Sequence, residues 1–181
     1  VFPQLYVMGL IDMKEQQKEK ISKNIKAGLK RLQLFQTVNG GFAYWPGETY
    51  ESEWGTNYAG HFMIEAENQG YSIPNNMKQK WIKYQQQQAR NWTDNNGMYT
   101  HPHGKETNQA IQAYRLYVLA ISGNAEMGAM NRLREEKNLS ATAKWRLASA
   151  YKVAGQNEVA LNLIQGLPTS IKHYKELSYS Y

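Results

Sequence analysis

Five aromatic rings lie within thirteen residues of this chain, in the segment NGGFAYWPGETYESEW at 39–54. They are Phe42, Tyr44, Trp45, Tyr50 and Trp54. Rings that project from a loop can stack on a sugar, a base or a peptide. Rings also bury large apolar areas, and a long loop needs a small core of its own, so a structural plug is the leading interpretation. We expect Phe42 to be buried and Tyr44, Trp45 and Trp54 to be available for contact.

Two histidines offer a second kind of chemistry. The string THPHGKE at 100–106 places His101 and His103 two residues apart, a spacing that can bring two ring nitrogens to one metal ion. A third ligand is required, and Glu106 or His61 could supply it only by accident of folding, so we expect no metal ion. A general base at the mouth of a pocket is a better functional interpretation, and an exposed polar loop is the leading one. His101 and His103 remain candidate binding residues.

Carboxylates in the aromatic segment raise the question of glycoside hydrolysis, which uses a pair of them. Glu48, Glu51 and Glu53 lie there, but Glu65 and Glu67 are the only carboxylates in or beside the nearest apolar helix, where a helical hydrolase would hold its acid and base. No nucleophile elbow, phosphate loop or dinucleotide fingerprint occurs. We therefore assign no catalytic residue and no cofactor, and expect the chain not to be an enzyme.

Composition excludes several other classes. The formal net charge is +6, but basic and acidic residues are interleaved, as in RLREEKN at 132–138, which indicates a solvated surface and no nucleic-acid partner. Cysteine is absent, which excludes a disulfide framework and a thiol nucleophile within these residues. No apolar run approaches the length of about 18 residues that a membrane span needs, so we expect no membrane contact.

Helical periodicity dominates the chain and alternates between two types of helix. Amphipathic patterns predict half-exposed helices, and nearly uniform apolar patterns predict buried ones. The expected exposed helices are 15–36, 75–90, 125–137 and 156–165, and the expected buried ones are 56–69, 107–122 and 140–154. Glycines follow each buried helix, at Gly70, Gly123 and Gly155, where they are well placed to end it. Tyr58 and His61 fall on the first buried helix, and we expect them to be hydrogen-bonded core groups.

Long loops connect exposed helices to buried ones, at 37–55 and 91–106. The strings FQTVNGGFAYW and NWTDNNGMYTH resemble each other, and the repeat is offset by 51 residues from Thr56 to Thr107. This pattern predicts an all-α fold, an incomplete α/α toroid of helical hairpins with its long loops gathered at one mouth. The competing architecture is a right-handed solenoid, since WRLASAYKVAGQNEVALNLI is similar to a tetratricopeptide unit.

The central forty residues resemble the thioester-domain region of the bacterial α2-macroglobulin family. In that family a QxxDGGFxYWPG loop leads into W-x-T-x-Y-A-x-x-F-L-x-E-A-x-x-x-G-Y-x-V-P. The matching residues are Gln36, Gly40, Gly41, Phe42, Tyr44, Trp45, Pro46, Gly47, Trp54, Thr56, Tyr58, Ala59, Phe62, Glu65, Ala66, Gly70, Tyr71 and Pro74. The likeness extends over nearly the whole chain, through AIQAYRLYVLAISG and RLASAYKVAG.

The resemblance also implies what is missing. In the family, a string like VFPQLY follows a Cys-x-Glu-Gln motif whose Cys and Gln side chains form an internal thioester. That motif is absent here, and MKEQ at 13–16 has Met13 in place of Cys. The chain begins without an initiator Met, and both ends look cut. We therefore expect residues 1–181 to be a single-domain fragment of a larger multi-domain protein.

The family's function is implied in the same way. Its larger proteins are protease traps of the bacterial cell envelope, so the implied partners are proteases and the other domains of the parent chain, in the periplasm or envelope. The toroid would shield a thioester supplied from outside this chain, with the aromatic segment 39–54 keeping water away. Complement relatives carry a catalytic His at a position that corresponds here to Thr107, so none is assigned.

Two other functions remain open at this stage. One is a toroidal carbohydrate-active enzyme or sugar-binding module that uses Tyr44, Trp45 and Trp54 in the 39–54 loop. The other is a tetratricopeptide-like interaction domain.

Overall fold

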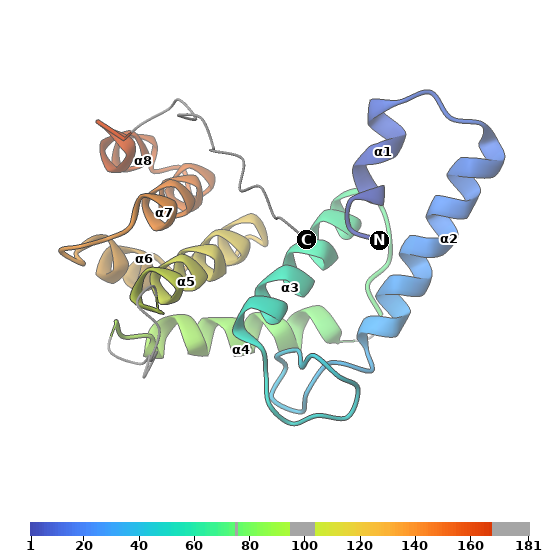
Figure 1. Ribbon diagram of the computed structural model, residues 1–181, viewed down its shortest axis with the longest axis horizontal. Coiled ribbons are helices and arrows are strands. Elements are labelled where there is room, and N and C mark those ends of the chain that lie inside the picture. Colours follow the sequence, from blue (N-terminus) through green and yellow to red (C-terminus); the bar gives the residue numbers. More distant parts are fainter. Residues whose placement is uncertain (75, 95–103, 168–181) are drawn as a thin grey trace, which may run out of the picture.

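The computed structural model describes residues 1–74, 76–94 and 104–167, and their regular structure is helical (Figure 1). Within these residues the only strand-like feature is an isolated antiparallel bridge between Gln36 and Phe42. The helices are α1 (Gln4–Leu10), α2 (Glu15–Leu32), α3 (Glu53–Asn68), α4 (Met77–Asn91), α5 (Gly104–Ile121), α6 (Met127–Arg134), α7 (Ala141–Val153) and α8 (Asn157–Ile164). The predicted all-α class is confirmed.

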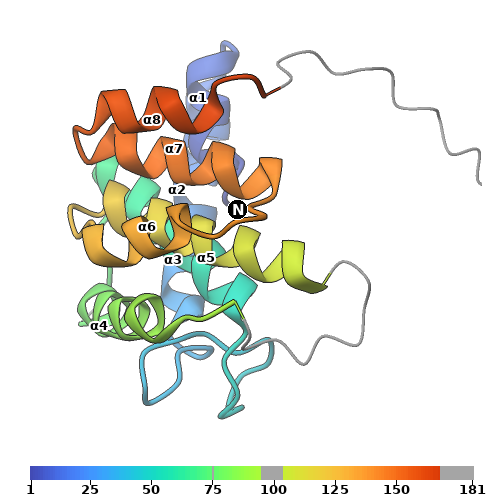
Figure 2. The same ribbon diagram turned by 90° about the vertical axis from the view of Figure 1, so that its left-hand side faces the viewer.

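Helices α3, α5 and α7 form one layer, in which α5 packs against both α3 and α7. Helices α2, α4, α6 and α8 flank them, and each contacts the neighbouring helix of the first layer (Figures 1 and 2). The helices predicted to be buried are therefore the inner ones, and the amphipathic helices are the outer ones. This is the arrangement of an incomplete α/α toroid built of helical hairpins. No helix of the described residues is long and apolar enough to cross a bilayer.

The helix-ending glycines were correctly predicted. Gly70, Gly123 and Gly155 have φ of 85°, 78° and 79°, the left-handed conformation that glycine adopts without a steric cost. The residue after each glycine donates its backbone N–H back to the last helical turn, for example from Tyr71 to the Ala66 carbonyl at 3.0 Å. Each buried helix is thus closed by a hydrogen-bonded glycine cap.

Other helix boundaries differ from those expected. Helix α2 ends at Leu32 instead of residue 36. The chain continues through a tight turn, in which the Phe35 N–H donates to the Leu32 carbonyl, before it enters the antiparallel bridge at Gln36. Helix α1 was not predicted, although its Leu5 is only 2% exposed. The expected N-cap Asn75 lies outside the described residues. Ser140 is confirmed as an N-cap, since its hydroxyl accepts from the Ala143 N–H at 3.3 Å.

Two apolar clusters make up the core. One lies among α2, α3 and α4 around Trp81, which is fully buried, and the other lies among α5–α8 around Leu147. Between them runs a stripe of buried polar side chains on α5, Asn108, Gln109, Gln112 and Arg115. The sequence pattern predicted a buried helix that is almost wholly apolar from Ala110 onward; the burial is confirmed, but Gln112 and Arg115 make this face polar.

Close packing of α3 on α4 predicts a large effect of one methyl group. Gly60 lies directly against the indole ring of Trp81, and a Cβ built at Gly60 would overlap that ring. Gly60→Ala should therefore lower the free energy of unfolding by about 1–3 kcal/mol through overpacking. Urea denaturation followed by circular dichroism measures this.

Gly128→Ala is the matched control, because it also adds a methyl group within a helix but meets no atom within 4 Å. We expect this variant to be unchanged or more stable by up to about 1 kcal/mol, since alanine is the better helix former. Equal effects at both positions would contradict the packing argument.

Candidate functional site

The aromatic loop, which we define as residues 33–52 between α2 and α3, is tied down at its base. Gln36 and Phe42 form the antiparallel bridge that brings its first half together. The side-chain amide of Gln36 donates to the carbonyls of Gly40, at 3.1 Å, and Met77, at 2.9 Å. The second bond reaches the first residue of α4, so the base of the loop is fixed to a helix that is distant in sequence.

Two adjacent glycines allow the loop to lie this close to α4. Gly40 has φ of 103°, and a Cβ there would collide with the backbone carbonyl of Lys80. At Gly41 a Cβ would lie 2.5 Å from Cγ of Glu51 and 2.9 Å from the ring of Tyr84. The Gly-Gly pair is therefore required by backbone conformation and by space.

Phe42 anchors the second half of the loop. Its ring is 2% exposed, which confirms the expectation that it is buried. Its N–H donates to the hydroxyl of Thr56 at 2.8 Å, and that hydroxyl donates to the Phe42 carbonyl at 3.3 Å. The same carbonyl accepts the backbone N–H of Ser52, the N-cap of α3, at 2.8 Å. The first turn of α3 and the loop thus hold each other in place.

The carboxylates Glu48, Glu51 and Glu53 all accept hydrogen bonds, and Glu48 Oε2 accepts the backbone N–H of Trp45 at 3.3 Å. Glu51 Oε1 accepts hydrogen bonds from the Thr37 hydroxyl at 2.7 Å and the Asn39 amide at 3.0 Å. Burial alone would raise the pKa of Glu51, but these hydrogen bonds outweigh it and hold the pKa below its ordinary value. Glu53 accepts from the guanidinium of Arg115 at 3.1 Å. A general acid needs a raised pKa, so Glu51 is poorly suited to glycoside hydrolysis.

The candidate aromatic residues divide into two groups. Tyr44 and Trp45 lie at the tip of the loop and are 64% and 69% exposed. Trp54 and Tyr58 lie on the first two turns of α3, where their rings stack with centroids 5.0 Å apart and planes 12° apart. The structure thus brings together Trp54 and Tyr58 as one ring pair. Tyr58 is 39% exposed, so the expectation that it is a core group was wrong.

The stacked pair continues into the beginning of the chain. Phe2 lies with its ring centroid 5.2 Å from that of Tyr58 and 5.7 Å from that of Phe62. Beside these rings is an apolar pocket of about 370 Å³ between α2, the aromatic loop and α3. Its walls include Val1, Phe2, Phe42, Ala43, Tyr58 and Phe62. Phe2 was not predicted as a site residue, because nothing local to VFPQLY shows what it packs against.

His61 lies one turn beyond Tyr58 and joins α3 to α5. Its Nδ1 and the hydroxyl of Tyr114 are 2.9 Å apart and share a hydrogen bond, and Phe2 approaches its ring edge-on with centroids 5.0 Å apart. Burial raises the pKa of Tyr114 to about 12, so that hydroxyl keeps its proton. Burial lowers the pKa of His61, while Glu65, whose carboxylate lies 3.8 Å from Nε2, opposes that shift. The expectation of a hydrogen-bonded polar group is confirmed for His61.

The second long loop, at 91–106, can be described only in part. His101 and His103 lie outside the described residues, as does most of the repeated NWTDNNGMYTH string. Among the residues that are described, no cluster of three His, Asp or Glu side chains could hold a metal ion.

Arg115 is the other important residue that sequence reasoning missed. Its side chain is 1% exposed and donates to Gln85 at 3.1 Å, to Gln112 at 2.5 Å and to Glu53. The signal was present in the sequence, because residues 108, 109, 112 and 115 fall on one face of a helix. Those four positions are all polar.

Comparison with known proteins bears on what this site does. No protein-family model matches the chain. The curated α2-macroglobulin of Escherichia coli strain K12 is 30% identical over 148 residues, which cover 76% of this chain and 8% of that protein. The chain therefore spans only a small part of the relative's length.

Solved structures give the same result for the fold. Trypsin-activated α2-macroglobulin from Escherichia coli matches with a TM-score of 0.73 and 27% identity, over 90% of this chain and 12% of that one. Salmonella α2-macroglobulin reacted with methylamine matches with a TM-score of 0.75 and 27% identity, over 90% and 11%. The resemblance seen in the sequence is confirmed.

The anchor at Phe42 predicts a stability effect at Thr56, which is fully buried. Thr56→Val keeps the side-chain shape but leaves the buried N–H of Phe42 without its acceptor. We expect the free energy of unfolding to fall by about 1–3 kcal/mol. The exposed Thr142→Val change on α7 is the control and should stay within about 0.5 kcal/mol. Urea denaturation of both variants tests the anchor, which an unchanged Thr56→Val variant would argue against.

The lowered pKa of His61 predicts a loss of stability in mild acid. The unfolded chain titrates this group at its ordinary pKa, about 6.5, and the folded chain titrates it lower, so the unfolded state binds the proton first. The stability contributed by neutral His61 is complete above about pH 6.5 and is lost as the pH falls toward the pKa of the folded state.

His61→Gln retains a polar partner for Tyr114 and removes the titration. Thermal melts between pH 8 and pH 5 should show a smaller acid-induced fall in Tm for this variant than for the original chain. Parallel pH profiles for the two proteins would show that His61 does not contribute.

Proposed function

Because the chain is related in sequence and fold to the bacterial α2-macroglobulins, we propose that it is the thioester-domain-like scaffold of a bacterial protease trap. In this proposal the helices shield a reactive thioester that residues outside this chain supply. The activity belongs to the larger protein, of which a segment of this kind forms a small part. The chain itself then acts as a non-enzymatic support in the cell envelope or periplasm.

The observation that carries the proposal is the position of the first residues. Val1 and Phe2 form part of the wall of the apolar pocket, beside Phe42 and Tyr58. In the family that the sequence resembles, the Cys-x-Glu-Gln motif comes shortly before a string like VFPQLY. A polypeptide entering at Val1 therefore reaches the chain at the pocket that Tyr58 also lines.

The chemistry of a thioester explains why an apolar, rigid surrounding is useful there. Water hydrolyses a thioester, so a site that must stay reactive until triggered has to exclude water. The rings of Phe2, Phe42 and Tyr58 present apolar surface, and the hydrogen bonds at Gln36 and Thr56 keep the aromatic loop in place. Because these side chains are already held in place, they can exclude water without a conformational change of the helices.

The partners proposed for the parent protein follow from the relatives. The Escherichia coli relative was solved in a trypsin-activated form and the Salmonella relative after reaction with methylamine. For the parent of this chain we propose the same chemistry. An amine attacks the thioester carbonyl, an amide bond forms, and the C–S bond breaks to leave the cysteine as a thiol. With a protease lysine as the amine, the protease becomes covalently attached.

Substitution of Tyr58 tests the shielding role in the longer gene product that carries both this chain and the thioester. Tyr58→Ala opens one wall of the pocket and should speed spontaneous hydrolysis about tenfold, which corresponds to about 1.4 kcal/mol in the barrier. The release of free thiol, followed with a chromogenic disulfide reagent, measures the rate.

Tyr50→Ala is the control, because Tyr50 is 86% exposed and lies outside the pocket wall. It should leave the hydrolysis rate unchanged. Equal rates for the Tyr58 variant and the parent protein would refute the shielding role, and a gene without an upstream Cys-x-Glu-Gln motif would refute the thioester itself.

A further inference from the structure

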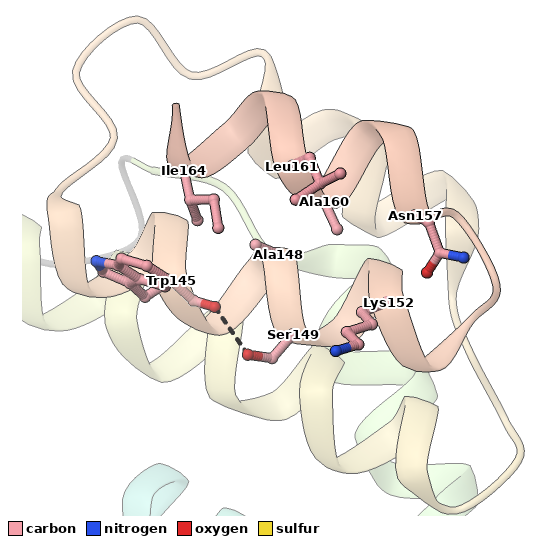
Figure 3. A pocket seen from close by; sticks show the side chains of 8 residues that line it. All are labelled: Trp145, Ala148, Ser149, Lys152, Asn157, Ala160, Leu161 and Ile164. Atoms are coloured by element: carbon pink, nitrogen blue, oxygen red, sulfur yellow. Dashed lines mark hydrogen bonds between the residues drawn. The ribbon is translucent and has the colours of Figure 1, made fainter. Parts of the chain in front are cut away.

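Two cavities among the described residues differ in the chemistry of their walls. The groove between α7 and α8, of about 460 Å³, is lined mainly by apolar side chains such as Trp145 and Leu161, and its Ser149 hydroxyl donates to the Trp145 carbonyl (Figure 3). A cleft of about 540 Å³ lies between the aromatic loop and α4, and its lining includes Asn39, Glu51, Lys80, Lys83, Tyr84 and Gln87. Apart from Val38, each side chain that lines this cleft carries a polar group. The cleft therefore offers hydrogen bonds where the groove offers apolar contact.

Tyr84 lines the polar cleft with a phenol that is almost entirely buried. The residue is 9% exposed, and its hydroxyl makes no hydrogen bond to another described residue. Burial raises the pKa of Tyr84 to about 12, so the hydroxyl keeps its proton and can both donate and accept. Buried polar groups normally have a partner, so a ligand in the cleft that reaches Tyr84 would supply the missing hydrogen bond.

Glu51 adds an acceptor to the same cleft. The hydrogen bonds that it receives from the side chains of Thr37 and Asn39 both end on Oε1. A carboxylate has lone pairs for further donors, and Oε2 receives neither of these two bonds. A hydroxyl group on a ligand is a suitable donor to this oxygen.

Two lysines give the cleft an excess of positive charge. Lys80 and Lys83 lie three residues apart on α4, both are exposed, and neither forms an ion pair with a described carboxylate. Their two positive charges stand against the one negative charge of Glu51, so an anionic group on the ligand is favoured. The volume of the cleft exceeds that of a simple oxyanion and lies in the range of small-molecule sites, about 300–1,000 Å³.

The two walls of the cleft are held together without a ligand. The Gln36 amide donates to the Met77 carbonyl at 2.9 Å, and Gly40 lies against the backbone carbonyl of Lys80. A ligand therefore does not have to order the loop when it binds, which removes one of the usual entropic costs of binding.

We propose that the cleft between the aromatic loop and α4 binds a sugar acid, a small molecule that carries several hydroxyl groups and one carboxylate. The carboxylate binds at Lys80 and Lys83, and hydroxyl groups bind at Glu51 and Tyr84. This binding needs neither a thioester nor any residue outside this chain, so it stands or falls independently of the proposed function.

Titration of the ¹⁵N-labelled chain with glucuronate, followed by NMR at constant ionic strength, tests the proposal. We expect a Kd of about 1 mM, with shifts centred on the amides of residues 38–39, 51 and 80–88. Glucose lacks the carboxylate and acetate lacks the hydroxyl groups, so each should bind at least about fivefold more weakly. Acetate, glucose or phosphate binding as tightly as glucuronate would overturn the proposal, as would shifts that lie elsewhere.

Substitutions on α4 separate the site from general attraction to a basic protein. Lys80→Gln with Lys83→Gln should weaken glucuronate binding at least about fivefold. Lys23→Gln with Lys26→Gln is the matched control, because it removes two exposed charges at the same spacing from α2 and should leave the Kd unchanged. Equal weakening by both pairs would contradict a specific site.

Tyr84→Phe isolates the contribution of the buried hydroxyl. The variant should be as stable toward urea as the original chain, because the hydroxyl has no hydrogen-bond partner among the described residues. It should nevertheless bind glucuronate about three- to tenfold more weakly. An unchanged Kd, or a loss of stability equal to the loss of binding, would count against the proposal.

Discussion

The buried guanidinium of Arg115 is the interaction on which the inner layer depends. It reaches α3 through Glu53, α4 through Gln85 and its own helix through Gln112. A buried charge is costly unless every hydrogen-bonding group around it is satisfied, and removal of one partner leaves it uncompensated. The three helices therefore have few alternative positions relative to one another. The apolar clusters on either side supply most of the burial, but this polar contact sets the register.

The register of α3 in turn positions the aromatic loop and the pocket. Glu53 is the first residue of α3, so Arg115 holds the end of the loop as well as the helix. Thr56, one turn later, holds Phe42, and Tyr58 directs its ring toward Phe2. A site assembled on the first turns of a fixed helix is more rigid than one assembled on a free loop. Such rigidity would suit the exclusion of water that we propose for this site.

Several parts of this arrangement could be predicted from local patterns. Gly70, Gly123 and Gly155 were recognisable because a glycine after an apolar helical run has one common use. Burial of Phe42 followed from the tight Gly-Gly turn beside it. Helix α1 could not be predicted, because its seven residues are too short to show a clear period and depend on tertiary packing for their stability. The exposure of Tyr58 was also missed, because helical periodicity predicts which face of a helix is apolar but not which elements cover that face.

The sequence by itself determined the all-α class, the alternation of inner and outer helices and the resemblance to a protein family, since these depend on residue spacing along the chain. The tertiary structure alone decided that Tyr44 and Trp45 stay exposed and that Val1 and Phe2 complete the pocket. The contact between Phe2 and Tyr58 joins residues 56 positions apart. No local pattern records such a distance, because it results from how the helices pack around Arg115 and Trp81.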